Sequence, residues 1–143
     1  MNYTKENGMR RRLASTVAAT TVMTALAVLG GASAAQAEPH NVGWLYAVGG
    51  GGAVFFDADL AGYPGYEKIT VCDNESNGKG VQGAVYPNFD GYGAYFVKDP
   101  SNDGRCASIQ GDFFPEDKGV EVWVWEYAGD NQYNHNFAFN GVS

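Results

Sequence analysis

The chain has 143 residues, with 9 Lys and Arg against 16 Asp and Glu, and a formal net charge of −7. An acidic chain of this kind repels phosphate groups, so we exclude nucleic acid and anionic membrane surfaces as expected partners. The length predicts one domain with a modest core.

The first 37 residues predict a secretory signal peptide. Lys5 and the run 10–12 supply positive charge, a mostly apolar stretch spans 13–29, and small residues end at 35–37. This order predicts export and cleavage after Ala37, by the general or the twin-arginine route. We do not expect a membrane anchor, because Ser and Thr interrupt the apolar stretch, which leaves no run of about 18 apolar residues.

Residues 38–143 are the expected mature domain. They hold five of the nine Lys and Arg and fifteen of the sixteen Asp and Glu, so their net charge is −10. They also hold nineteen of the twenty aromatic residues. A small domain buries most of its rings, and rings left outside are candidates for binding.

Short runs of alternating apolar and polar residues fill the mature domain, separated by Gly, Asn, Asp and Pro. This period of two predicts strands. We expect eight strands, near residues 43–48, 53–58, 66–72, 80–86, 92–98, 105–110, 119–127 and 134–140. The predicted fold is all-β, either an antiparallel β-sandwich or a partly closed barrel.

A partial internal repeat covers residues 53–78 and 84–104. Each copy contains a strand, a turn with glycine and tyrosine, a second strand and an acidic loop. Duplication of a hairpin would explain the repeat. The restricted set of residues that β-turns use would explain it equally well.

Cys72 and Cys106 are the only cysteines, and an exported protein can join them in a disulfide. Both cysteines lie out of phase with the apolar side of their expected strands. We therefore expect the bond to join strand ends or neighbouring strands outside the core, unlike the inter-sheet bridge of antibody domains. A free catalytic thiol is the alternative.

The general layout resembles that of small secreted proteins of Gram-positive bacteria with one disulfide and an all-β domain. The resemblance is carried by the signal peptide, the sequence Thr-Val-Cys-Asp at 70–73 and the later Cys106. That group has no common activity, so the resemblance implies a secreted all-β domain and no particular function.

Two acidic loops, 73–78 and 99–104, lie next to the cysteines and carry spaced oxygen atoms that suit calcium. A disulfide would bring both loops to one end of the domain. The candidate ligands are Asp73, Glu75, Asn77, Asp99, Ser101 and Asp103. Neither loop completes an EF-hand, because Ala84 and Gln110 stand at the twelfth positions. Ordinary turns without a metal are the alternative.

The densest aromatic segment is 121–127. As a strand it places Trp123, Trp125 and Tyr127 on one face, and Val120, Val122 and Val124 on the other. If the valines face the core, the rings form a flat outward strip that could stack on sugar rings or on a protein partner. Glu121 and Glu126 would then bond the ligand. The alternative is that the rings themselves are core.

Enzymatic sets are incomplete. Glu121, Arg105 and His135 supply the residue types of a small secreted ribonuclease, but the mature domain keeps only this arginine. Carboxylates that could hydrolyse glycosides, at Asp112, Glu116 and Asp117, fall in an expected loop. We assign no catalytic residue, and a small secreted hydrolase stays an alternative.

The leading prediction is therefore a monomeric, non-enzymatic extracellular domain that binds a glycan or a protein surface. A third hypothesis is an inhibitor of another organism's exported enzyme. Such a protein would present a stiff apolar loop, for which Phe113-Phe114-Pro115 is the candidate.

Overall fold

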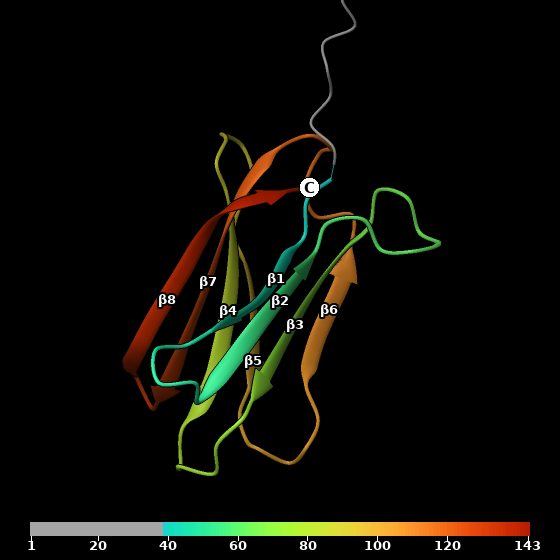
Figure 1. The fold of residues 1–143 in the computed structure, drawn as a ribbon. Helices are drawn as coiled ribbons and strands as arrows, with labels where there is room; N and C mark the ends of the chain where they lie inside the picture. Colours follow the sequence, from blue (N-terminus) through green and yellow to red (C-terminus); the bar gives the residue numbers. More distant parts are fainter. Residues whose placement is uncertain (1–38) are drawn as a thin grey trace, which may run out of the picture. The chain divides into compact units, whose positions relative to one another are not determined.

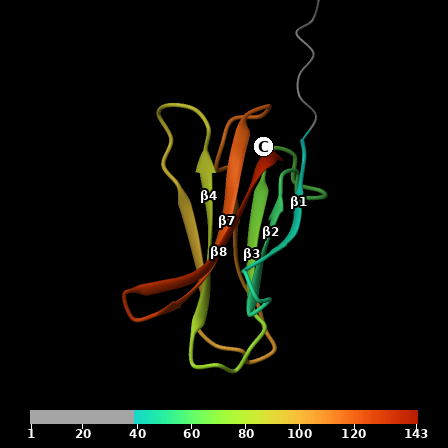
Figure 2. The ribbon, with the colours of Figure 1, turned by 60° about the vertical axis from the view of Figure 1, so that its left-hand side comes forward.

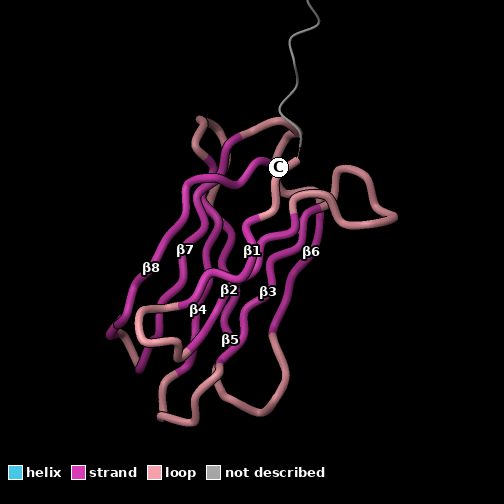
Figure 3. Tube along the Cα trace, viewed as in Figure 1, coloured by secondary structure: helices cyan, strands magenta, loops and turns pink. Residues whose placement is uncertain are grey.

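The structure is a computed structural model that describes residues 39–143. The expected signal peptide and its cleavage site lie outside the described residues. Within residues 39–143 the secondary structure consists of strands and loops, with no helix (Figures 1 and 3). The strands are β1 (Val42–Tyr46), β2 (Gly52–Asp57), β3 (Glu67–Asp73), β4 (Gly80–Pro87), β5 (Tyr95–Asp99), β6 (Ala107–Gly111), β7 (Gly119–Ala128) and β8 (Asn131–Val142).

The strands form two four-stranded antiparallel sheets, in the orders β1-β2-β3-β6 and β5-β4-β7-β8. Figure 2 views these sheets nearly edge on, as two layers. The predicted β-sandwich is confirmed, and the barrel alternative is not, because the two sheets stay separate. Across the sandwich β1 lies against β8, and β6 lies against β5, so these strands mark its two edges.

Two strand starts differ from the prediction by three residues, and the other boundaries differ by at most two. β5 begins at Tyr95 rather than near residue 92, because Gly91 has a φ of 94° and belongs to a turn. β8 is longer than expected and begins at Asn131, because Gly129 and Asp130 make a tight hairpin turn directly after β7.

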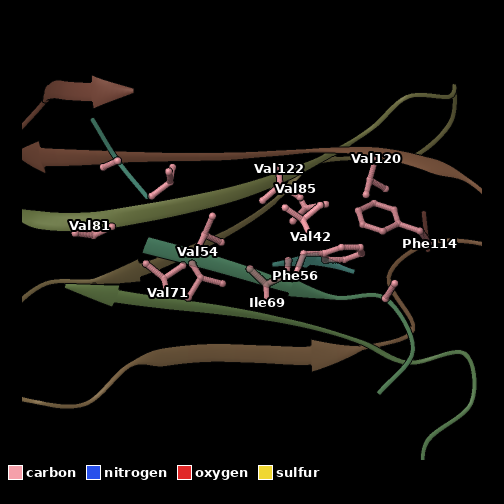
Figure 4. Close-up of a cluster of buried hydrophobic side chains, with 14 residues drawn as sticks. Val42, Val54, Phe56, Ile69, Val71, Val81, Val85, Phe114, Val120 and Val122 are labelled. Atoms are coloured by element: carbon pink, nitrogen blue, oxygen red, sulfur yellow. The ribbon is translucent and has the colours of Figure 1, made fainter. Parts of the chain in front are cut away.

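The core lies between the sheets and is built mainly from valine side chains of both layers (Figure 4). On β7, Val120, Val122 and Val124 have no exposed surface, so of the two alternatives for this strand the valines face the core. The sheets approach closely at Gly83 on β4. A Cβ atom there would lie 2.6 Å from Val71 Cγ2, so this position has no space for a side chain.

The two copies of the sequence repeat are two β-hairpins, β2–β3 in one sheet and β4–β5 in the other. The hairpins face one another across the core. Their second strands end at Asp73 and Asp99. The main-chain N–H of Asp73 donates a hydrogen bond to the side chain of Asp99. The acidic loops that follow therefore start at the same end of the sandwich.

Cys72 and Cys106 form the expected disulfide. The ladder between β3 and β6 pairs Val71 with Ala107, so the cysteines occupy the next position and tie neighbouring strands of one sheet. Cys106 is exposed and Cys72 is buried, and neither cysteine belongs to the core cluster between the sheets. The prediction of a clamp outside the core is confirmed, and the bonded state excludes the free-thiol alternative.

Candidate binding face

Five aromatic side chains form a continuous row on the outer face of the β5-β4-β7-β8 sheet. We call this set the aromatic row; in spatial order it consists of Phe96, Tyr86, Trp123, Phe137 and Phe139. Strand register assembles it, since Trp123 on β7 pairs with Phe137 on β8 and with Ala84 on β4. Ala84 also pairs with Phe96 on β5, and its short side chain is completely covered.

The rings contact one another at the separations of ordinary aromatic pairs. Trp123 stacks on Phe137 with 4.7 Å between ring centroids and 29° between planes. Tyr86 meets Trp123 edge-on at 6.2 Å and Phe96 edge-on at 5.7 Å. Phe139 extends the row from Phe137 at 4.8 Å. The row is therefore ridged, because most neighbouring rings are steeply inclined to one another.

Much of the aromatic row is open to solvent. Phe96, Phe137 and Phe139 are 50%, 46% and 57% exposed. Phenylalanine is usually buried, and a contiguous set of exposed rings on a small domain marks a surface that contacts a ligand or partner.

A groove of about 300 Å³ runs beside Trp123, and Tyr86, Pro87, Asn88 and Glu121 complete its lining. Glu121 Oε2 accepts a hydrogen bond from Trp123 Nε1 at 3.2 Å, which orients the indole. The groove thus combines aromatic surface with a carboxylate and an amide, the mixture found in small-molecule sites.

Trp123, Trp125 and Tyr127 of β7 do not form the flat outward strip that the sequence suggested. All three lie on the outer face, but Trp125 is only 4% exposed and stacks on His135 at 5.6 Å. Tyr127 is half-buried, since its ring covers Gly80 and Lys98 Nζ lies 4.9 Å from the ring centroid. Trp123 alone joins the exposed row, and the open rings come from β5 and β8.

Glu126 lies away from the aromatic row and bonds within the protein. It is 2% exposed, and it accepts hydrogen bonds from Lys79 at 2.8 Å, from Asn77 at 3.2 Å and from Asn134. Burial raises the pKa of Glu126, but these bonds outweigh burial and lower the pKa below its usual value. This residue ties the loop after β3 to the β7–β8 hairpin, so we do not include it in the binding face.

The acidic loops meet as predicted, but not all six candidate ligands converge. Asn77 Oδ1 accepts from Lys79 N, and Asp103 Oδ1 from Arg105 N, each at 2.9 Å, so these side chains stabilise local turns. Glu75 and Ser101 are exposed residues that line a cavity between the two loops. Within residues 39–143 no group of three or more His, Cys, Asp and Glu side chains is arranged to hold a metal ion.

The ribonuclease-like set is not assembled. Arg105 precedes β6 and His135 lies on β8, and these strands are at opposite edges of the sandwich. Glu121 lies on the outer face of β7, bonded to Trp123. The three residue types therefore do not share a site.

Two carboxylates of the loop after β6, Asp112 and Glu116, lie near Glu67, a residue that sequence reasoning missed. Glu67 on β3 has no exposed surface, and its Oε2 accepts from Phe113 N at 2.8 Å. Burial raises the pKa of Glu67, and the nearby Glu116 and Asp112 raise it further. The sequence did contain a signal for this burial. Glu67 lies two residues before Ile69 on β3, so both side chains are on the same face of the strand, and that face points into the core. A fully buried Glu67 cannot reach a substrate.

Residues 113–115 do not protrude as an inhibitory loop would. Phe114 is 1% exposed and belongs to the core, where it meets Tyr95 at 5.4 Å. Phe113 also packs against Tyr95, with 4.4 Å between the ring centroids. Ser143 Oγ donates to Pro115 O at 3.0 Å, which holds the segment to the chain's last residue.

No protein-family model, no curated protein and no solved structure matches this chain.

Proposed function

We propose that the mature domain is an extracellular binding module that holds a neutral glycan along the aromatic row. The observation that carries this proposal is the row itself, which crosses all four strands and leaves three phenylalanine rings about half exposed. A sheet face with this much open aromatic surface needs a partner that tolerates flat apolar contacts.

Sugar chemistry fits the groove beside Trp123. The C–H faces of a sugar ring pack on aromatic rings, and its hydroxyl groups need both donors and acceptors. Glu121 supplies an acceptor and Asn88 supplies both, and both line the groove. Because the mature domain carries a net charge of −10, a neutral glycan is favoured over an anionic one.

We also propose that the domain works outside the cell, after cleavage following Ala37. The disulfide supports export, since such bonds persist in oxidising compartments. In the described part of the chain, no helix has the length and apolar character needed to cross a membrane. Intact-mass analysis of the culture supernatant tests the cleavage, and a species that retains residues 13–29 would contradict it.

The binding test uses the disulfide-bonded mature domain and a panel of cellulose, chitin, xylan, β-1,3-glucan and starch. We expect retention on at least one of them. Trp123→Ala and Phe137→Ala should each weaken binding at least about tenfold, because central aromatic residues dominate binding surfaces. Trp44→Ala is the matched control, since this indole is 47% exposed on a strand of the other sheet and should leave binding unchanged.

Three results would overturn the proposal. One is binding to none of the neutral polysaccharides, and another is equal loss of binding in Trp44→Ala. The third is a stable dimer in sedimentation that dissociates when Phe137 is replaced, because the aromatic row would then be an interface between copies. Release of reducing ends from a bound polysaccharide would instead favour the hydrolase alternative.

A further inference from the structure

The end of the sandwich where β3 and β5 stop contains a second cavity, on a different part of the molecule from the aromatic row. The loops 74–79 and 100–106 both cross between the sheets at this end. A cavity of about 320 Å³ lies between them, and the polar side chains that line it are Asp73, Glu75, Ser76, Lys79, Ser101 and Asn102. We call this region the acidic end.

Asp73 is the central group of the acidic end. Its side chain is buried, with 6% of the residue's surface exposed, and Oδ1 accepts a hydrogen bond from Glu75 N at 3.0 Å. The other oxygen, Oδ2, is also buried and has no hydrogen-bond partner among the described residues. A buried carboxylate oxygen without a partner is costly, so this atom points to a missing group.

A second buried carboxylate adds to the negative charge. Asp99 is 5% exposed, and its Oδ2 accepts from Asp73 N at 2.9 Å. The one ion pair among residues 39–143 joins Lys79 to Glu126 at 2.8 Å, so Lys79, which itself lines the cavity, is already engaged. Within the described residues, Asp73 and Asp99 therefore have no basic side chain paired to them.

We propose that the acidic end binds a calcium ion, with the carboxylates of Asp73 and Asp99 as its charged ligands. Calcium takes about six to eight oxygen ligands and accepts carbonyl, amide and water oxygens beside carboxylates. The remaining ligands would come from Ser101, Asn102, main-chain carbonyls and water. A site with only two carboxylate ligands belongs to the weak class of extracellular modules, with a Kd of about 0.1 to 1 mM.

The ion would stabilise the fold at this end, where it would hold the ends of β3 and β5 and the two crossing loops together. The inference does not depend on glycan binding, because the two sites share no residue. Each can therefore fail without the other.

The test measures thermal unfolding of the chelator-treated, disulfide-bonded mature domain with calcium from zero to about 10 mM, at constant ionic strength. We expect the Tm to rise by roughly 5 °C, since the ion binds the folded state alone. Asp73→Asn and Asp99→Asn should abolish this rise. Asp103→Asn is the matched control and should retain it, because Asp103 is exposed and asparagine keeps the oxygen that accepts from Arg105 N.

Isothermal titration with calcium chloride on the same proteins gives a reading that does not depend on stability. The proposal is supported if the wild type and Asp103→Asn each bind calcium in one event and Asp73→Asn shows no binding. The absence of heat and of any Tm shift at about 10 mM calcium would overturn it. Equal shifts in all variants would also overturn it, as would stabilisation by acid with no calcium effect, because a proton would then neutralise the pair.

Discussion

Asp73 and Asp99 end strands of different sheets, yet the main-chain N–H of Asp73 donates a hydrogen bond to Asp99 Oδ2 at 2.9 Å. The bond joins the two sheets at one end of the sandwich, close to the disulfide at Cys72. It forms because the hairpins β2–β3 and β4–β5 face one another with their second strands ending together. The same arrangement creates the buried pair of carboxylates that we assign to calcium.

The disulfide should contribute a large part of the stability. Replacing both Cys72 and Cys106 with serine should lower the free energy of unfolding by about 2–5 kcal/mol, the usual cost in small secreted domains. Urea denaturation of the variant and the wild type measures the difference. The same loss should follow when the wild type is reduced, and an unchanged midpoint in both experiments would contradict the prediction.

Trp125 should behave as a packed residue although it lies on the outer face of a sheet. Trp125→Ala should cost about 3–5 kcal/mol, because the indole is 4% exposed and stacked on His135. Trp44→Ala should cost about 1 kcal/mol or less, since that side chain is 47% exposed. Denaturant melts of the two variants test this, and equal losses would contradict the burial of Trp125.

Glu67 should make stability depend on pH. Burial raises its pKa in the folded protein, so between the unfolded value of 4.5 and the folded value the native state holds the extra proton. Stability should therefore fall as the pH rises through this window, when a buried carboxyl must ionise. Glu67→Gln cannot ionise and should lack this component of the fall.

The measurement is a series of urea melts from about pH 4.5 to pH 8. The difference in the free energy of unfolding between the wild type and Glu67→Gln removes the contribution of the other carboxylates. Asp130→Asn is the control, because this carboxylate is exposed in the turn after β7 and is not among the groups that act on Glu67, so the variant should follow the wild type. Parallel curves for the wild type and Glu67→Gln would show that Glu67 does not cause the dependence.

Gly83 should not tolerate a side chain. Gly83→Ala would place a Cβ 2.6 Å from Val71 Cγ2 and 2.8 Å from Val54 Cγ2, and this overpacking should cost about 1–3 kcal/mol. Gly93→Ala is the control, since a Cβ there meets nothing within 4 Å and should leave stability nearly unchanged. Thermal melts compare them, and equal Tm values would mean that the sheets separate without cost.

The local pattern of the chain was enough to predict the all-β class and the two faces of each strand, and it left a sandwich and a partly closed barrel as alternatives. The strands and their faces depend on residues close in sequence, because a period of two assigns each side chain to one face of its strand. That rule places Val122 and Trp123 on opposite faces of the strand, and the structure decided that Val122 points into the core. The disulfide followed from the presence of only two cysteines in an exported chain.

Exposure depends on neighbouring strands, and this only the tertiary structure decided. Trp123 and Trp125 share a face, but register places Phe137 beside the first and His135 over the second. Glu126 is not free to bind a ligand, because Lys79 from the loop after β3 and Asn134 from β8 donate hydrogen bonds to it. Such contacts join residues distant in sequence, so alternation along one strand identifies the outer face and leaves open which of its rings meet solvent.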